Sequence, residues 1–261
     1  MKTLKLAVIL ASSGVMSASA DLLVDRGLPT ANLNNAAGAN RANVAWADNE
    51  PTGTTPYAPG DSFSIGGSGN YIVSDIRVWE VGGSTTGLSL LGGFGSGSIT
   101  SLSSSYTAQS VTYGDGSTYQ GSSGGFLSIY QLDFAVNIPL NGSQTLDFFL
   151  NGPSTADTVN GGYDSLFLHA SNAGLSGSPQ QGSDGVFLFY DPTSGNVLTW
   201  GSGTGAGTYD PGVAGWDKDS DGNVQVFGSA VPEPRTLVSG ALMLLPFGAG
   251  TLRMLRKRLA A

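Results

Sequence analysis

Short runs of β-branched and aromatic residues recur along the middle of this chain, and clusters of Gly, Ser, Asn and Pro separate them. The two longest runs are 71–81 (YIVSDIRVWEV) and 126–136 (FLSIYQLDFAV). The shorter runs are 62–65, 88–91, 145–150, 166–169, 186–190, 197–200 and 224–227. Such runs predict strands, and no longer segment has the repeat of an amphipathic helix. We therefore expect an all-β body, an antiparallel two-sheet β-sandwich of the jelly-roll kind.

The breaks between these runs contain the residues that tight turns require. The clearest is 191–196 (DPTSGN), in which Pro192 presets φ and Gly195 accepts a positive φ. The chain has no cysteine, so burial of a core must stabilise the body without disulfides. The absence of cysteine also excludes thiol catalysis and cysteine-ligated metal centres.

The N-terminal residues have the three parts of a secretory signal peptide. Lys2 and Lys5 form a positive region, and a mostly apolar run follows over 6–16. Ala18 and Ala20 then supply the small residues of a cleavage site. The apolar run is too short for a stable membrane anchor. We expect the general secretion machinery to export the chain and signal peptidase to remove residues 1–20.

The C-terminal residues combine a stiff motif, an apolar span and a basic end. Pro232, Glu233 and Pro234 precede the uncharged segment 236–252. At ~1.5 Å per residue a helix over this segment is roughly 26 Å long, just enough to cross a bilayer core of ~30 Å. An amphipathic surface helix is the alternative, but both faces would be apolar. A basic cluster follows and should stay in the cytoplasm: Arg253, Arg256, Lys257 and Arg258.

This order of Pro-Glu-Pro motif (231–234), membrane span and basic tail (253–261) resembles the PEP-CTERM sorting signal of Gram-negative bacteria that make extracellular polysaccharide. The resemblance covers only residues 231–261, and Arg235 departs from the usual pattern. It implies that an exosortase in the inner membrane recognises and cuts the tail. We therefore expect a single-pass precursor with its body, residues 21–230, outside the cytoplasm, and a final place in the cell envelope or the biofilm matrix.

Removal of both ends would leave a strongly acidic body. Of the 11 basic and 19 acidic residues of the chain, the body keeps 4 and 18, so its net charge is −14 against −8 for the whole chain. Such a surface repels nucleic acid and anionic lipid, and attracts divalent cations. Binding to acidic extracellular polysaccharide would require calcium as a bridge.

One acidic segment resembles the start of a calcium loop. In DKDSDGN the carboxyls of Asp217, Asp219 and Asp221 alternate, and Asn223 could add its carbonyl. The twelfth position is Gly228 where a calcium loop has a bidentate Glu, and no helix pattern flanks the segment. An acidic hairpin turn is the alternative. Ca²⁺ is the one cofactor that the sequence brings into consideration.

Catalytic patterns are weak in this chain. The segment 121–125 (GSSGG) fits the G-x-S-x-G string of hydrolases, but a Gly-rich loop leads from it into a strand and not into a helix. His169, the single histidine, follows an apolar strand-like run, where a packed imidazole is the usual arrangement. We predict no catalytic residue from these patterns.

Tyrosine and hydrogen-bonding side chains gather in the Gly/Ser-rich stretch before residue 121. Tyr113, Asp115 and Tyr119 could form a lectin-like sugar site, because aromatic faces stack on sugar rings and a carboxylate can bind hydroxyls. Packing of these tyrosines within the fold is the alternative.

Two hypotheses for the body follow. The first is a non-catalytic envelope or matrix protein with a structural, adhesive or carbohydrate-binding role. The alternative is an exported polysaccharide hydrolase that uses a pair of the body's carboxylates as acid and base. A cleft with two carboxylates roughly 5–10 Å apart would favour the hydrolase.

Overall fold

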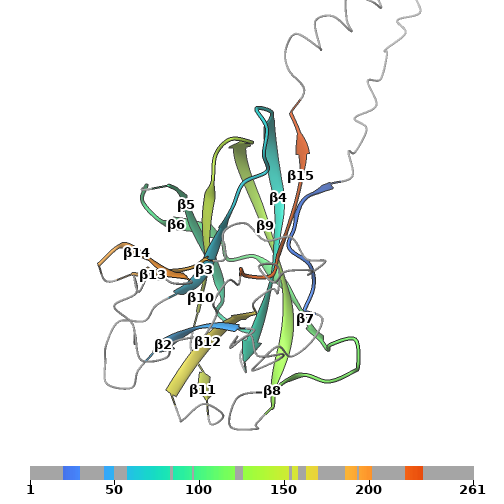
Figure 1. Cartoon of the computed structure of the whole chain (residues 1–261), viewed down its shortest axis with the longest axis vertical. Helices are drawn as coiled ribbons and strands as arrows, with labels where there is room; N and C mark the ends of the chain where they lie inside the picture. Colours follow the sequence, from blue (N-terminus) through green and yellow to red (C-terminus); the bar gives the residue numbers. More distant parts are fainter. Residues whose placement is uncertain are drawn as a thin grey trace, which may run out of the picture.

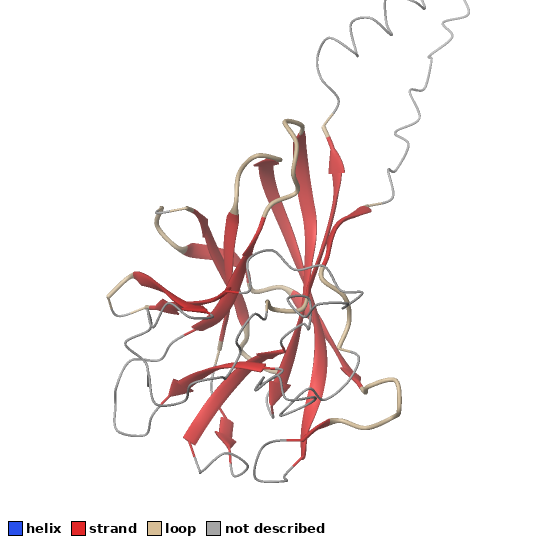
Figure 2. Cartoon of the chain, viewed as in Figure 1, coloured by secondary structure: helices blue, strands red, loops and turns tan. Residues whose placement is uncertain are grey.

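A computed structural model describes residues 20–29, 44–49, 58–82, 85–95, 97–120, 126–152, 155–157, 163–169, 186–192, 194–201 and 221–231. These residues form strands, turns and loops, and none of them is helical (Figure 2). Within these ranges no helix is long and apolar enough to span a membrane. The predicted signal peptide up to residue 19 and the predicted span 236–252 lie outside them.

The described strands form two antiparallel sheets (Figure 1). The first sheet has nine strands: β1 (Asp21–Asp25), β2 (Val44–Asn49), β4 (Asn70–Gly82), β7 (Tyr106–Val111), β8 (Tyr119–Gln120), β9 (Phe126–Asn141), β11 (Thr155–Asp157), β12 (Tyr163–His169) and β15 (Val224–Ala230). The second has six: β3 (Ala58–Phe63), β5 (Ser89–Phe94), β6 (Thr100–Ser103), β10 (Leu146–Asn151), β13 (Val186–Asp191) and β14 (Asn196–Gly201). The all-β prediction is confirmed for the described residues.

The long pair β4–β9 is the backbone of the first sheet. It runs from Asn70 opposite Asn141 to Gly82 opposite Ser128. On the other side of β4, two strands follow one another: β15 pairs with residues 71–78, and β12 pairs with Glu80 and Val81. Strand β1 covers the outer edge of β15.

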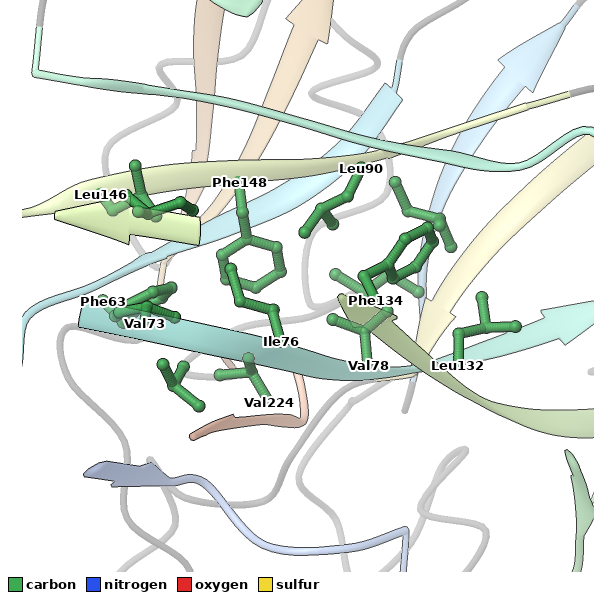
Figure 3. Close-up of a cluster of buried hydrophobic side chains, with 14 of the residues drawn as sticks. Phe63, Val73, Ile76, Val78, Leu90, Leu132, Phe134, Leu146, Phe148 and Val224 are labelled. Carbon is green, nitrogen blue, oxygen red and sulfur yellow. The ribbon is translucent and has the colours of Figure 1, made fainter. Parts of the chain in front are cut away.

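One apolar core joins the two sheets. Because side chains alternate along a strand, every second residue of β4 points inward, where Ile76 and Val78 meet Phe148 of β10 and its neighbours. Figure 3 shows how side chains of both sheets interleave in this core. Burial at ~25 cal/mol per Å² of apolar surface is the main stabilising term for a chain without disulfides.

A second, smaller core lies on the outer face of the first sheet. Trp79 and Val81 of β4 and Phe167 of β12 are fully or almost fully buried there. The ring of Tyr113, in the segment between β7 and β8, and the ring of Tyr119, at the start of β8, cover them. This part of the sheet is therefore buried on both faces, which explains why all of the last five residues of β4 are buried.

All nine predicted runs overlap strands, and the predicted turn 191–196 joins β13 to β14, with Gly195 at φ 74°. Strands β1, β2, β6, β7, β8 and β11 were not predicted. Their sequences are short, or they are rich in Ser, Thr and Gln, as in β6 (TSLS) and β7 (YTAQSV). The middle of β7 is exposed, so no apolar alternation was available to mark it.

The described body begins and ends at the same end of the first sheet. Asp21, the first residue of β1, lies opposite Gly228, near the end of β15. The two strands run side by side in Figure 1. We call this end the tail end. The far end contains Gly82, Ser128 and the segment between β7 and β8.

Candidate functional site

Buried polar side chains gather where β12 ends and β15 begins. These two strands meet head to tail along one side of β4, and the amide of Asn223 bonds to the carbonyl of His169 across the junction, at 2.8 Å. Asn223 is 0% exposed and His169 is 1% exposed. Their side chains must therefore find hydrogen-bond partners inside the protein.

The side chain of Asn223 determines which ring nitrogen of His169 carries a proton. Its Nδ2 donates to the carbonyls of Arg26 and Gly27, at 3.2 and 3.0 Å. This assigns Oδ1 as the atom that faces His169 Nδ1, at 2.7 Å. Because Oδ1 can only accept, His169 carries a proton on Nδ1.

The other ring nitrogen of His169 faces Tyr113. The distance from Nε2 to the Tyr113 hydroxyl is 2.9 Å, and the two rings meet edge to face. In the neutral tautomer Nε2 accepts the proton of the hydroxyl. Both nitrogens are thus engaged within the protein, and neither is available to a metal or a substrate. The sole histidine anchors the β7–β8 segment to the junction of β12 and β15.

On the inner side of the same junction, Arg26 and Asp61 form a buried ion pair. Arg26 Nη1 lies 2.8 Å from Asp61 Oδ2, and the side chains are 4% and 0% exposed. The amide of Gly222 donates to the same oxygen at 2.6 Å. The pair thereby connects the end of β1, strand β3 of the second sheet and the approach to β15.

Burial raises the pKa of Asp61 to about 7, although the Arg26 guanidinium and the Gly222 and Ser62 amides oppose this rise. Desolvation of two buried charges often exceeds their mutual attraction, so the pair is weak evidence for added stability. The ion pair instead connects three segments that are far apart in the sequence. The sequence analysis does not identify either residue of this ion pair. The one feature that could have drawn attention to Arg26 is that the body has only 4 cations.

Glu80 is a further carboxyl of the interior, on the first sheet. It is 2% exposed, lies on β4 between Tyr130 and Leu168 of the neighbouring strands, and its Oε2 has no hydrogen-bond partner. Burial raises its pKa to about 8. The sequence indicates that Glu80 is buried, because the alternation of side chains along a strand places Glu80 on the same face as Ile76 and Val78.

The Glu80→Gln variant should therefore change the pH dependence of stability. The folded-state pKa of Glu80 lies above its ordinary value of 4.5, so the folded protein is most stable with respect to this group below pH 4.5, and stability is lost as the pH rises toward about 8 and the buried carboxyl must ionise. The slope from one such group is about 1.4 kcal/mol per pH unit. Urea unfolding at pH 5 and pH 8.5 should show a larger gain for the variant at pH 8.5. An equal gain at both values would contradict the assignment.

The predicted calcium loop is described only in part. Asp217 and Asp219 lie outside the described residues. Asp221 and Asn223 are buried, and both ends of the Asn223 carboxamide bond within the protein. No group of three or more metal-binding side chains occurs in the described part of the chain. The calcium loop stays a prediction.

The three candidate sugar-binding residues do not share one surface. The rings of Tyr113 and Tyr119 are buried, with 2% and 3% exposure, and pack in the outer core. Asp115 is exposed in the turn between them. There the hydroxyl and amide of Ser117 bond its carboxylate and lower its pKa. The tyrosines offer no open ring face for stacking in this arrangement.

The described carboxyls with raised pKa values do not form a pair in a cleft. Asp61 faces the interior and is bonded to Arg26, and Glu80 faces the interior from the other sheet. Asp147 lies beside the inward-pointing Phe148, so it faces the opposite side of the second sheet, and partial burial raises its pKa to about 6.

Several predicted functional residues lie outside the described ranges. They are Ala18 of the cleavage site and the tail residues Pro232, Glu233, Pro234, Arg253, Arg256, Lys257 and Arg258; the hydrolase-like string 121–125, from which no catalytic residue is predicted, lies outside them as well. Ala20 is described and exposed, directly before β1.

Comparison with models of protein families, with curated proteins and with solved structures found no match.

Proposed function

We propose that this chain is an exported cell-envelope or extracellular-matrix protein that an exosortase sorts, and that its body has a non-catalytic structural, adhesive or carbohydrate-binding role. Signal peptidase would release the N-terminus. The tail would hold the precursor in the inner membrane until the exosortase cuts it. The mature body would then be an acidic protein outside the cytoplasm.

One structural observation carries this proposal. Strand β1 begins at Asp21, directly after the predicted cleavage position, and β15 ends at Ala230, directly before the predicted sorting segment. The sequence signals that predicted these boundaries are independent of strand pairing. A body with its own paired first and last strands at these two positions is what cleavage at both ends would require.

We further infer that the two sheets form a β-sandwich of the jelly-roll kind. The chain passes between the sheets repeatedly: β3 is in the second sheet, β4 in the first, β9 in the first and β10 in the second. Crossings of this kind, with antiparallel pairing throughout, are typical of Greek-key sandwiches.

The interior polar groups support a structural role. His169, Asn223 and Tyr113 bond to one another, and Arg26 bonds to Asp61, so these side chains organise the fold. A hydrolase would need exposed acid and base groups beside a substrate.

The proposal is tested by producing the full chain in a Gram-negative host with an exosortase and in the same host without it. The expected result is a shortened product outside the membrane in the first host only, with the full-length tail retained in the second. Equal shortening in both hosts would overturn the proposal.

A further inference from the structure

The tail end of the body carries two loops that are bonded to each other. The loop between β3 and β4 and the loop between β9 and β10 exchange two backbone hydrogen bonds: Gly66 to the carbonyl of Gly142 at 2.9 Å, and Gly142 to the carbonyl of Gly69 at 2.8 Å. The two loops are thus one connected projection beyond the ends of β4 and β9, visible at the top of Figure 1.

The last described residue is bonded to the base of this projection. The amide of Val231 donates to the carbonyl of Asn70 at 2.8 Å, so strand pairing continues to Val231. Only residues 232–235 separate it from the predicted membrane segment. Fully extended, this connection reaches roughly 17 Å. Since a headgroup layer is itself roughly 5–8 Å thick, the tail end must lie within roughly 10 Å of the lipid surface in a membrane-held precursor.

The loops at this end carry no charge, although the body is strongly acidic. The loop sequences 64–70 (SIGGSGN), 94–99 (FGSGSI) and 141–145 (NGSQT) contain no Asp, Glu, Lys or Arg. Asp21 and Asp147 lie on the adjoining strands and not in these loops. At the far end, by contrast, the loop between β7 and β8 carries the exposed Asp115. Asp21 is exposed at the start of β1, so the uncharged loops are the part of this end that an anionic bilayer repels least.

Exposed apolar side chains concentrate at the same end. In the described part of the chain five large apolar side chains are exposed, and three of them belong to the tail end. They are Leu22 at 46% on β1, Phe94 at 40% at the end of β5, and Val231 at 42%. Phe94 lies opposite Leu146, at the start of the strand that follows the loop 141–145. Aromatic and apolar side chains of this kind are favoured at a membrane interface.

We propose that the tail end is a docking surface for the lipid headgroup layer, so that the precursor stands on the membrane with its far end outward. This inference rests on the proposed function, because the membrane-held tail brings the surface to the lipid. The contact would present the segment 231–235 at the membrane surface, where a membrane enzyme such as an exosortase must reach it.

Two matched positions test the contact. The chain has no cysteine, so Ser68→Cys and Ser128→Cys each give a single labelling site on an exposed serine. Ser68 is in the tail-end loop, and Ser128 lies opposite Gly82 at the far end of β4. The twelve residue steps from Asn70 to Gly82 separate the two ends by roughly 40 Å.

The labelled full-length precursor is reconstituted in vesicles of phosphatidylethanolamine and phosphatidylglycerol that contain a headgroup-nitroxide lipid. The fluorophore at position 68 should be quenched at least about twofold more than the one at position 128, because only the first lies near the headgroups. Equal quenching at both positions, in protein that floats with the vesicles, would overturn the docking surface alone. Failure to float would overturn the proposed membrane-held precursor as well.

A second pair of variants tests the chemistry of the surface. Phe94→Asp places a carboxylate at the tail end, and Phe126→Asp places one at the far end, where Phe126 is 65% exposed. The first should reduce quenching at position 68, because a carboxylate is repelled by anionic headgroups. The second should leave it unchanged. The same effect from both variants would overturn the proposal.

Discussion

Replacing Pro232 and Glu233 together by alanine should leave the chain at full length in the membrane fraction, with almost complete loss of tail removal. The two prolines lack amide donors and have a fixed φ, so the sequence predicts a stiff, extended triplet. The double substitution removes one of the two prolines that restrict the triplet and its one carboxylate. Immunoblots of membrane and released fractions, with a C-terminal epitope, measure the outcome.

Arg235→Ala is the matched control for that variant. Arg235 follows the triplet directly and is the residue that departs from the sorting pattern. Its replacement should leave processing unchanged, since it belongs neither to the motif nor to the uncharged span. Normal release of the Pro232→Ala, Glu233→Ala chain would show that the exosortase interpretation of the tail is wrong.

Replacing Asp61 by alanine should destabilise the body by about 3–5 kcal/mol, because it removes the buried carboxylate that contacts Arg26 Nη1. It also removes the acceptor of the Gly222 amide. The end of β1 and the approach to β15 would lose their side-chain connection to strand β3 of the second sheet. Urea unfolding at pH 8, where Asp61 is ionised, measures the loss.

Asp133→Ala is the control for this change, because it breaks the other described Arg–Asp pair. Asp133 is bonded to Arg77, and both side chains are 28% exposed. Partly exposed pairs contribute roughly 0–1 kcal/mol, so the control should cost far less. The double variant Arg26→Met, Asp61→Leu should recover most of the stability, since it removes both charges of the pair and replaces them with apolar side chains. A cost for Asp61→Ala no larger than for Asp133→Ala would refute this role of the pair.

The strands that the sequence predicts are those with an apolar inner face. In β4 and β9 the alternation of apolar residues reflects contact with the core, so period and β-branched content identify them. Strand β7 is held by its ladder to β9 and has an exposed middle, so only the three-dimensional pairing reveals it. The assignment of strands to two sheets likewise depends on pairing between distant residues.

The candidate site was less predictable because its contacts join distant positions. Tyr113 and His169 are separated by 56 residues, and Arg26 and Asp61 by 35. A lone histidine after an apolar strand indicates a packed imidazole, which is what the structure contains, but its partners could not be read from spacing. The sequence suggests a sugar site at Tyr113 and Tyr119, but aromatic residues near Gly and Ser occur both in exposed loops and on covered sheet faces. The structure places both rings on a covered face.

The most direct test of export and cleavage at both ends is the intact mass and terminal sequence of the protein recovered from the envelope or matrix of an exosortase-bearing host. We expect a chain that begins at Asp21 and ends before Arg253, and that keeps both β1 and β15. A recovered protein that still carries residues 1–20 or the basic segment 253–261 would contradict it.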